Sequence, residues 1–381
     1  MAGRVRRVVL LGGGHAHLEV LRQAARRPFD GAELILVSPY PRHHYSSMVP
    51  GFLHGSYAET DLAFDLPALC AAAGARFIEG WAGTVDGAAR TVIAGGETIE
   101  FDVVSLDVGS DPAGLEVPGV RDHAETVRPI TRTLALRARL EAIAAEQAGG
   151  AVHLCVVGGG AAGAEVAWAV QRRLAGAGHA PRITLVERES QLLPEYSPAA
   201  RRRARQLLER RAVRIALGRE VAAVGPLAVT MDGGEQIPSQ LTLWLTGAAP
   251  NELVRRSPLA KDARGFVLVD ATLRAVDGAP VWGAGDCVSQ RDHPETPRAG
   301  VYAVRQAPVL AANLRSAAEG RPATRRFTPQ PHFLALLDTA DGRALLRWHG
   351  VLGHSRAAWQ LKRWIDRRYV RRYQRVYGGP A

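Results

Sequence analysis

The chain has 381 residues, 48 Lys+Arg against 37 Asp+Glu, and a formal net charge of +11 at pH 7. This length predicts about two domains, and a content of 47% hydrophobic and 22% charged residues excludes a disordered chain. Nearly all basic residues are arginine, since only Lys261 and Lys362 are lysines. The three cysteines, Cys70, Cys155 and Cys287, lie too far apart to indicate a disulfide framework or a metal cluster. We therefore expect a reducing cytoplasm and no metal site.

The sequence predicts no membrane-spanning segment. The apolar run Val8–Leu11 near the N-terminus is too short for a signal peptide. No stretch reaches the ~18 apolar residues of a transmembrane helix. We expect a cytoplasmic protein, or one that is peripheral on the cytoplasmic face of the membrane.

One local pattern occurs twice, about one domain apart. Residues 8–20 read VVLLGGGHAHLEV and residues 153–166 read HLCVVGGGAAGAEV. Each is an apolar strand, a glycine run and the start of a helix, and a second apolar strand follows at 33–37 and at 183–186. Such βαβ units are typical of dinucleotide binding. Two of them in one chain predict that one dinucleotide passes electrons to another.

Further elements complete an α/β pattern. Before the second unit we expect strands at 76–79 and 101–106 and a helix at 131–146. After it we expect a helix at 198–211, strands at 241–245 and 281–282, and a helix at 300–318. The end of the chain predicts a hairpin of strands 332–338 and 343–349 and a helix at 356–373.

The second glycine run has the complete GxGxxG pattern, with Gly158, Gly160 and Gly163. These glycines allow the tight turn, the approach of a pyrophosphate and close packing of helix on strand. The phosphate then lies at the positive end of the helix dipole. Glu187 ends the next strand, where a carboxylate binds the adenosine ribose. Only Arg188 favours a 2′-phosphate, so the sequence predicts NADH rather than NADPH.

The first glycine run departs from this pattern. Gly12 and Gly14 are in place, but His17 occupies the third glycine position and Ser38 replaces the acid at the end of the second strand. Such a run alone is also compatible with a glycine-rich turn in an unrelated α/β fold. The complete second run in the same chain favours a nucleotide site.

Five ordered motifs together resemble the pyridine nucleotide-disulfide oxidoreductases, flavoproteins with two dinucleotide sites. They are GGGHAH at Gly12–His17, SLDVGS at Ser105–Ser110, GGGAAGAE at Gly158–Glu165, LTGAAPN at Leu245–Asn251 and GAGD at Gly283–Asp286. The resemblance implies two Rossmann-like α/β domains with a short C-terminal α+β cap. It implies an FAD-binding domain of residues 1–115 and 265–325, an NAD(P)H-binding domain of residues 116–264, and a cap of residues 326–381.

The resemblance also implies which residues bind the cofactors. FAD belongs at the first glycine run and NADH at the second, with Asp286 binding the flavin's ribityl or phosphate region. Gly109 and Gly247 belong to turns that cross between the domains. The remaining positions that match the FAD site are Gly12, Gly14, His15, Ala16, His17 and Ser38.

Within the family the chain resembles type II NADH dehydrogenases and, more closely, a subgroup often fused to selenide, water dikinase. That subgroup has GGGHSHVEVLR at the first turn, and residues 12–22 here read GGGHAHLEVLR. The resemblance implies that His17 is a trait of the subgroup. No kinase domain is present, so a role in selenium metabolism stays a suggestion.

Disulfide chemistry is not expected. Disulfide reductases of this family carry a CxxxxC pair soon after the first βαβ unit, and residues 40–54 contain no cysteine. The resemblance therefore implies hydride transfer from NADH to the flavin, then electron transfer to a small acceptor, with a quinone first among the candidates. In type II NADH dehydrogenases a helix with an AQxAxQ pattern lines the quinone pocket. Here Val301 replaces its first glutamine and Gln306 follows.

Three residues are candidates for catalysis. Glu165, at the start of the second unit's helix, either positions the nicotinamide or caps and packs the helix. His44, in a loop with His43 and Tyr45 that should border the flavin, is either a proton donor or an ordinary loop residue. Gln306 is the third candidate.

The last helix combines an aromatic stripe with many arginines. The stripe recurs every four residues, at Leu361, Ile365, Tyr369, Tyr373 and Tyr377. Residues 362–381 contain seven basic residues, Lys362 among them, and one acid, Asp366. Either the stripe packs on the body while the cations are solvated, or the helix binds an anionic membrane surface. No nucleic-acid-binding motif is present, and the chain is expected to be a monomer or a homodimer.

Two alternatives stay open at this point. One is a soluble reductase of another acceptor, in selenium or sulfur metabolism. The other is a flavin-binding redox sensor with slow turnover.

Overall fold

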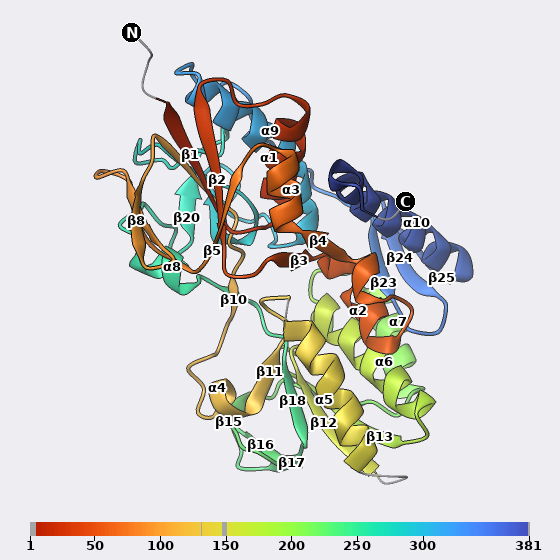
Figure 1. Cartoon of the computed structure of the whole chain (residues 1–381). Helices are drawn as coiled ribbons and strands as arrows, with labels where there is room; N and C mark the ends of the chain where they lie inside the picture. The colour runs from red at the N-terminus through yellow and green to blue at the C-terminus, as the bar shows by residue number, and fades with distance from the viewer. Residues whose placement is uncertain (1–4, 131, 147–150, 380–381) are drawn as a thin grey trace.

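Two five-stranded parallel sheets form the body of the computed structural model, which describes residues 5–130, 132–146 and 151–379 (Figure 1). The first sheet has the order β21 (Val281–Gly283), β9 (Val103–Leu106), β1 (Arg6–Leu11), β2 (Ala32–Ser38) and β5 (Arg76–Glu79). The second has the order β11 (Ala124–Thr126), β18 (Leu241–Trp244), β12 (Ala151–Val157), β13 (Ala180–Glu187) and β14 (Arg214–Leu217). The predicted Rossmann-like α/β fold is confirmed.

The repeated sequence pattern appears as a repeated structure. In each sheet the strand before the glycine run, β1 or β12, lies in the centre, and the strand that follows the helix lies beside it. The helices are α1 (His15–Arg26) and α6 (Ala161–Gly176). Each unit also carries an antiparallel three-stranded sheet. These are β6 (Ala82–Asp86), β7 (Thr91–Ala94) and β8 (Glu97–Glu100), and β15 (Val221–Val224), β16 (Ala228–Met231) and β17 (Gln236–Pro238).

Burial on both faces explains the continuous apolar runs of the central strands. Val8–Leu11 of β1 have no exposed surface, and helices α1 and α9 (Gly300–Ala318) pack against each other beside this sheet. Near the second sheet lies α5 (Arg132–Glu146), which matches the predicted helix except for Thr131, outside the described residues. The remaining longer elements include α2 (Val49–His54), α3 (Leu66–Ala72) and α7 (Pro198–Glu209).

The two sheets are joined by two adjacent crossings. Strand β10 (Asp111–Pro112) pairs antiparallel with β19 (Ala248–Ala249). The Ala113 amide donates to the Gly247 carbonyl at 2.7 Å. The side chain of Asn251 donates to the carbonyls of Val108 and Gly109 at 3.3 Å, and Gly109 has a positive φ of 66°. Both crossing turns therefore lie side by side.

The C-terminal segment contains a third strand that the sequence did not predict. Strands β23 (Ala335–Asp338), β24 (Ala344–Trp348) and β25 (Val351–Ser355) form an antiparallel sheet, where only a hairpin was expected. The missed turn is His349-Gly350, with φ of 43° and 82°. Positive φ at both positions is typical of a type I′ hairpin turn, for which Asn or Asp before glycine is the usual signal. A histidine at that position concealed the turn.

Helix α10 (Arg356–Gln374) packs on the body, but the predicted stripe is partly wrong. Leu361 is 38% exposed, whereas Lys362 and Asp366 are almost fully buried. Tyr373 of the stripe is buried, as expected, and donates its hydroxyl to the carboxylate of Glu19 in α1. The inward face of α10 therefore contains an ion pair, which a purely apolar pattern could not identify. Among the described residues, no helix combines the length and apolarity needed to cross a bilayer.

Candidate active site

The second glycine turn is built for a dinucleotide. Gly158 has a φ of +115°, and a Cβ at this position would lie 2.4 Å from the Leu245 carbonyl oxygen. A Cβ on Gly163 would lie 1.8 Å from the Gly158 carbonyl oxygen, because α6 packs tightly against the turn. Gly160, the N-cap of α6, provides no side chain to cap the helix and leaves open space beside it. The first amides of α6 can therefore bind a phosphate.

Glu187 lies where a ribose would bind. It is the last residue of β13, and its carboxylate accepts hydrogen bonds from the amides of Gly159 at 2.6 Å and Glu189 at 2.9 Å. These bonds hold the carboxylate beside the glycine turn. Arg188 is exposed and pairs with Glu189 at 3.5 Å. The site thus presents an acid for a 2′-hydroxyl, while the nearby arginine already has a partner.

Replacing Gly163 with valine is expected to abolish NADH binding. The new side chain would collide with the Gly158 carbonyl, which is backbone and cannot move without opening the turn. Gly176→Ala in the same helix is the matched control, because its Cβ would meet no atom within 4 Å. That control should bind NADH normally and unfold at a similar or slightly higher temperature. Quenching of NADH fluorescence measures the NADH affinity of both variants. Normal NADH affinity in Gly163→Val would contradict the prediction.

In the first glycine turn, His17 replaces the third glycine without opening the structure. Gly12 has a φ of +89°, and a Cβ there would lie 2.4 Å from the Asp107 carbonyl oxygen. The His17 ring is fully buried, with Nδ1 2.6 Å from the Gly12 carbonyl oxygen and Nε2 2.8 Å from Ser105 Oγ. The small side chain of Ser105 in β9 leaves room for the imidazole. His17 therefore braces the turn.

The first unit contains an acid that sequence reasoning missed. The Asp107 carboxylate accepts hydrogen bonds from the amides of Ala16 at 2.7 Å and His17 at 3.2 Å, at the start of α1. Burial raises the pKa of Asp107 to about 7, although both amides oppose the shift. The available signal was an acid that directly follows the fully buried strand β9. Ser38, at the end of β2, is buried and donates its hydroxyl to the Tyr40 carbonyl.

A cluster of four rings lies next to this turn. His15 contacts His43, Tyr45 and Tyr369, with ring centroids 5.1, 5.5 and 5.8 Å away, and Tyr45 stacks on Tyr369 at 4.5 Å. His15 Nδ1, His43 Nε2 and the Tyr369 hydroxyl are buried without a hydrogen-bond partner in the described part of the chain. Burial lowers the pKa of His15 to about 4. Unpaired buried polar atoms are costly, so these three indicate a bound polar group.

The structure distinguishes between the two histidines of the loop. His44, the predicted proton donor, directs Nε2 to the Glu59 carboxylate at 3.3 Å. His43 instead belongs to the ring cluster, as does Tyr45. Tyr369 was predicted only as part of the apolar stripe of the last helix. His43 is thus the loop histidine that contacts the region of the first glycine turn.

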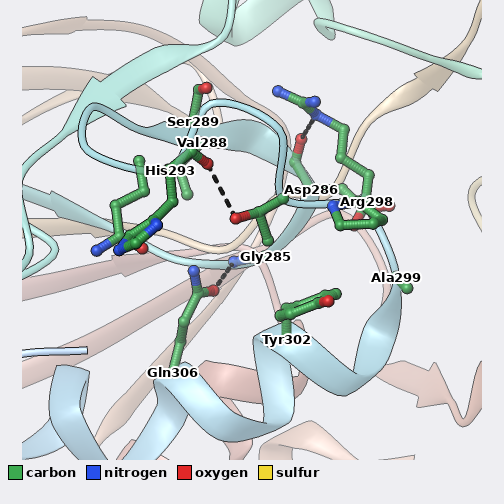
Figure 2. Close-up of a pocket in the computed structure, with 12 residues that line it drawn as sticks. Gly285, Asp286, Val288, Ser289, His293, Arg298, Ala299, Tyr302 and Gln306 are labelled. Atoms are coloured by element: carbon green, nitrogen blue, oxygen red, sulfur yellow. Dashed lines mark hydrogen bonds between the residues drawn. The ribbon is translucent and has the colours of Figure 1, made fainter. Parts of the chain in front are cut away.

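The GAGD turn packs against the first turns of α9 (Figure 2). The Gly285 amide donates to the side-chain oxygen of buried Gln306 at 2.8 Å, and Arg298 Nε donates to the Asp286 carbonyl at 3.2 Å. Arg128 lies 3.7 Å from the Asp286 carboxylate. Gln306 therefore holds the turn in place. A pocket at this turn is lined in part by Gly285, Asp286, Ser289, His293, Tyr302 and Gln306.

Glu165 lies in a buried cluster of charges where both units meet the C-terminal segment. Its carboxylate accepts the Asp338 amide of β23 at 2.7 Å. Burial raises the pKa of Glu165 to about 8, against the opposing charge of Lys362. Lys362 Nζ donates to the carbonyl and hydroxyl oxygens of Ser47, both at 2.7 Å, and to the Asp366 carboxylate at 2.9 Å. Three segments far apart in sequence thus contribute to one proton-holding centre.

The acidic groups of this centre stabilise the positive charge of Lys362. Burial would lower the pKa of the Lys362 ammonium, but Asp366 and Glu165 together raise it above its usual range. Ser47 donates its hydroxyl to Asp366 at 2.9 Å. Sequence reasoning identified Glu165 as a candidate at the start of the second unit's helix, either at the nicotinamide or in a capping or packing role, and counted Lys362 among the basic residues of the last helix. The signal for Lys362 was the i,i+4 Lys-Asp pair, each member of which directly follows a residue of the stripe.

Dithiol chemistry is excluded by the cysteines themselves. Cys70, Cys155 and Cys287 are free and buried. Burial raises the pKa of each thiol to about 12, so none is a ready nucleophile. The expectation of a non-disulfide acceptor is consistent with this geometry.

The first site as a whole is suited to a flavin dinucleotide. Gly12 and Gly14 let the glycine turn pack closely against Asp107. His15, the first residue of α1, and His43, which contacts it, have ring nitrogens without a partner in the described part of the chain. A Cβ on Gly300 would lie 3.6 Å from the His15 ring and from Ser46 Oγ, so α9 begins at the same place. A helix N-terminus there favours negative charge on a bound ring.

Comparisons with known proteins agree with this geometry. The family model described as pyridine nucleotide-disulphide oxidoreductase matches residues 6–307. Demethylphylloquinone reductase NdbB of Synechocystis is 25% identical, covering 89% of this chain and 86% of its own. The type II NADH:quinone oxidoreductase of Staphylococcus saprophyticus is 22% identical, covering 97% and 96%. The sulfide:quinone oxidoreductase of Aquifex aeolicus superposes with a TM-score of 0.80 at 17% identity, covering 99% and 93%, which shows a shared fold.

Proposed function

Because the chain belongs to the pyridine nucleotide-disulphide oxidoreductase family, we propose that it is an FAD-dependent oxidoreductase that transfers electrons from NADH to a quinone. One observation carries the choice of acceptor: Glu165 holds a proton at neutral pH near Lys362, and Lys362 bonds Ser47 in the cysteine-free segment where a dithiol reductase of this family has its cysteine pair. Reduction of a quinone to a quinol takes up two protons with two electrons. The names of the two curated relatives, a demethylphylloquinone reductase and an NADH:quinone oxidoreductase, support this acceptor.

Each unit has its own task in this proposal. The FAD-binding part comprises residues 1–115 and 265–325, with Gly12, Gly14, His15 and Asp286 at the cofactor. The NADH-binding part comprises residues 116–264, with Gly158, Gly160 and Gly163 at the pyrophosphate and Glu187 at the ribose. FAD, when bound, accepts a hydride from the nicotinamide and passes electrons on one or two at a time.

The protein's own residues handle the protons. With a pKa of about 8, the Glu165 carboxyl keeps its proton at neutral pH and can donate it. Lys362 holds a proton on Nζ and bonds Ser47, whose loop continues from His43 and Tyr45 of the ring cluster. Gln306 positions the GAGD turn through the Gly285 amide. Lys362, Asp366 and Asp338 are buried, which limits the access of water to this centre.

An acceptor panel tests the proposal. The purified full-length chain, loaded with FAD, should oxidise NADH rapidly with a short-chain quinone and slowly with a disulfide. NADPH should be the poorer donor because of Glu187. Fast turnover with selenium or sulfur compounds but not with quinone would favour a soluble reductase instead. Slow turnover with every acceptor would favour a redox sensor, and failure to bind FAD would exclude the whole assignment.

We further propose that the chain binds an anionic membrane surface through the C-terminal segment. Trp348 and Val351 flank the β24–β25 turn and are 42% and 60% exposed, and Trp364 of α10 is 58% exposed. Helix α10 packs on both strands, so these side chains belong to one segment. Arg368 lies over the Trp364 ring at 5.4 Å, which places a cation beside an interfacial aromatic. Exposed tryptophans among arginines suit a lipid interface.

Replacing both Trp348 and Trp364 with serine is expected to weaken binding to anionic vesicles by at least about tenfold, from the apolar area that would no longer be buried in lipid. Trp81→Ser is the matched control, since Trp81 is 68% exposed in the other part of the chain. Co-sedimentation with phosphatidylglycerol vesicles measures the effect. Equal pelleting of both variants would refute the proposed surface.

A further inference from the structure

Asp107 lies between the two turns of the first unit that face the cofactor, the GGG turn and the GAGD turn. A Cβ on Gly14 would lie 2.3 Å from the carboxyl carbon of Asp107, and a Cβ on Gly285 would lie 2.8 Å from its Oδ1. The carboxyl therefore touches the GGG turn on one side and the GAGD turn on the other. It is 5% exposed. Only glycine at both positions leaves room for it.

This carboxyl binds the amides that a pyrophosphate would otherwise use. Ala16 and His17 donate to Asp107 Oδ2 at 2.7 and 3.2 Å, and they are the second and third residues of α1. In glycine-rich dinucleotide sites the phosphate lies at this helix start. An ionised Asp107 would thus place a negative charge against a negative pyrophosphate inside a buried site. Two like charges in such a site cannot both stay ionised without a large cost.

The groups that face Asp107 do not neutralise it. They are Asp286 on the GAGD turn, Cys287 directly after it, Tyr369 on α10, and His15 and His17 on α1. Arg128 is close to Asp286, with which it pairs at 3.7 Å. Burial lowers the pKa of both His15 and His17 to about 4, so both rings are neutral at pH 7. A proton on Asp107 itself is the simplest means of removing the repulsion.

We propose that Asp107 is a pyrophosphate-binding residue of the FAD site that acts as a neutral acid, donating its carboxyl proton to a phosphate oxygen, so that FAD binding takes up one proton. This inference rests on the proposed function, because it concerns FAD. At the start of α1, the groups otherwise available to a pyrophosphate are backbone amides and the rings of His15 and His17. Asp107 adds a side chain that can donate a proton there. The proton comes from the solvent and forms the O–H bond of the Asp107 carboxyl; every other contact in the proposal is a hydrogen bond.

The sign of the pH dependence follows from the free chain. Burial raises the pKa of Asp107 to about 7 before FAD binds. A neighbouring pyrophosphate raises it further, so the complex holds the proton over a wider range than the free chain does. FAD affinity is then constant below about pH 6 and falls as pH rises, approaching tenfold per pH unit above about pH 8. His15 and His17, with a pKa of about 4, and Cys287, at about 12, keep their charge across this range.

FAD titrations of the FAD-free full-length chain between about pH 6 and about pH 9, followed by flavin fluorescence, test the proposal. The wild-type affinity should fall with pH as described, whereas Asp107→Asn should bind FAD with an affinity that varies little. Asp30→Asn, the same change at an exposed site near the far end of α1, should follow the wild type. Calorimetry of the wild type at about pH 8 in two buffers of different ionisation enthalpy should show uptake of about one proton.

Several results would overturn the proposal. A wild-type affinity that does not change with pH would show that Asp107 keeps one charge state throughout. A wild-type affinity for FAD that rises with pH would show that FAD binds the chain whose Asp107 is ionised, with the carboxylate turned out of the site. The wild-type titration and calorimetry decide the matter even when Asp107→Asn folds poorly. Absence of FAD binding at every pH would instead remove the proposed function, and this inference with it.

Discussion

The Lys362→Met variant is expected to lose most of its quinone reductase activity and about 3–5 kcal/mol of stability. Methionine has a similar length but cannot carry the charge that neutralises buried Asp366. It also leaves the Ser47 carbonyl and hydroxyl without their donor. The change removes three hydrogen bonds from the buried centre. Chemical unfolding and steady-state turnover with a short-chain quinone measure the two effects.

A double variant separates the effect on stability from the effect on activity. Replacing the pair together, as Lys362→Met with Asp366→Leu, removes both charges and leaves apolar side chains of similar volume. Such replacements of a buried ion pair are often neutral or stabilising. The double variant should therefore unfold near the wild-type midpoint but stay nearly inactive. Activity that returns together with stability would show that Lys362 serves only the fold.

This centre also shows the limit of what the sequence could predict. The glycine turns could be predicted because their spacing follows from local backbone geometry, and Glu165 could be predicted because it lies one turn into the helix that Gly160 caps. Lys362 was not, because its role depends on how α10 packs against a loop more than 300 residues earlier in the chain. A period of four residues predicts which side of a helix is apolar, and it does not predict a charge pair on the inward side.

Asp107 and β25 were missed for different reasons. The Asp107 motif was recognised as a match to the family, but the direction of its side chain depends on two turns that meet only in the folded chain. Strand β25 follows the unusual His349-Gly350 turn, for which local propensity gives no clear signal. Parallel strands such as β1 and β12, in contrast, could be predicted because their last four residues are buried on both faces and are therefore all apolar. Local sequence patterns therefore predicted the two repeated βαβ units. The positions of Asp107 and Lys362 depend on long-range packing, which these patterns do not describe.

Glu165→Gln is expected to lower the turnover number with quinone by about 10²- to 10⁴-fold, the usual contribution of a positioned acid or base. Glutamine keeps the shape and can still accept the Asp338 amide, but it has no proton to donate. Because the pKa of Glu165 is about 8, the wild-type rate should fall above about pH 8, where the carboxyl ionises. The turnover rate of the variant should not show this fall above about pH 8.

The same substitution has a stability signature of known sign. The pKa of Glu165 is higher in the folded chain than in the unfolded one, so the folded state binds the proton more tightly. Wild-type stability then falls as pH rises from about 4.5 to about 8, and the variant, which cannot ionise, is spared this loss. Glu165→Gln should therefore gain stability relative to the wild type with rising pH, whereas Glu209→Gln, an exposed control, should not. If Glu165→Gln keeps the turnover number of the wild type and the same fall in rate above about pH 8, the proton comes from another group.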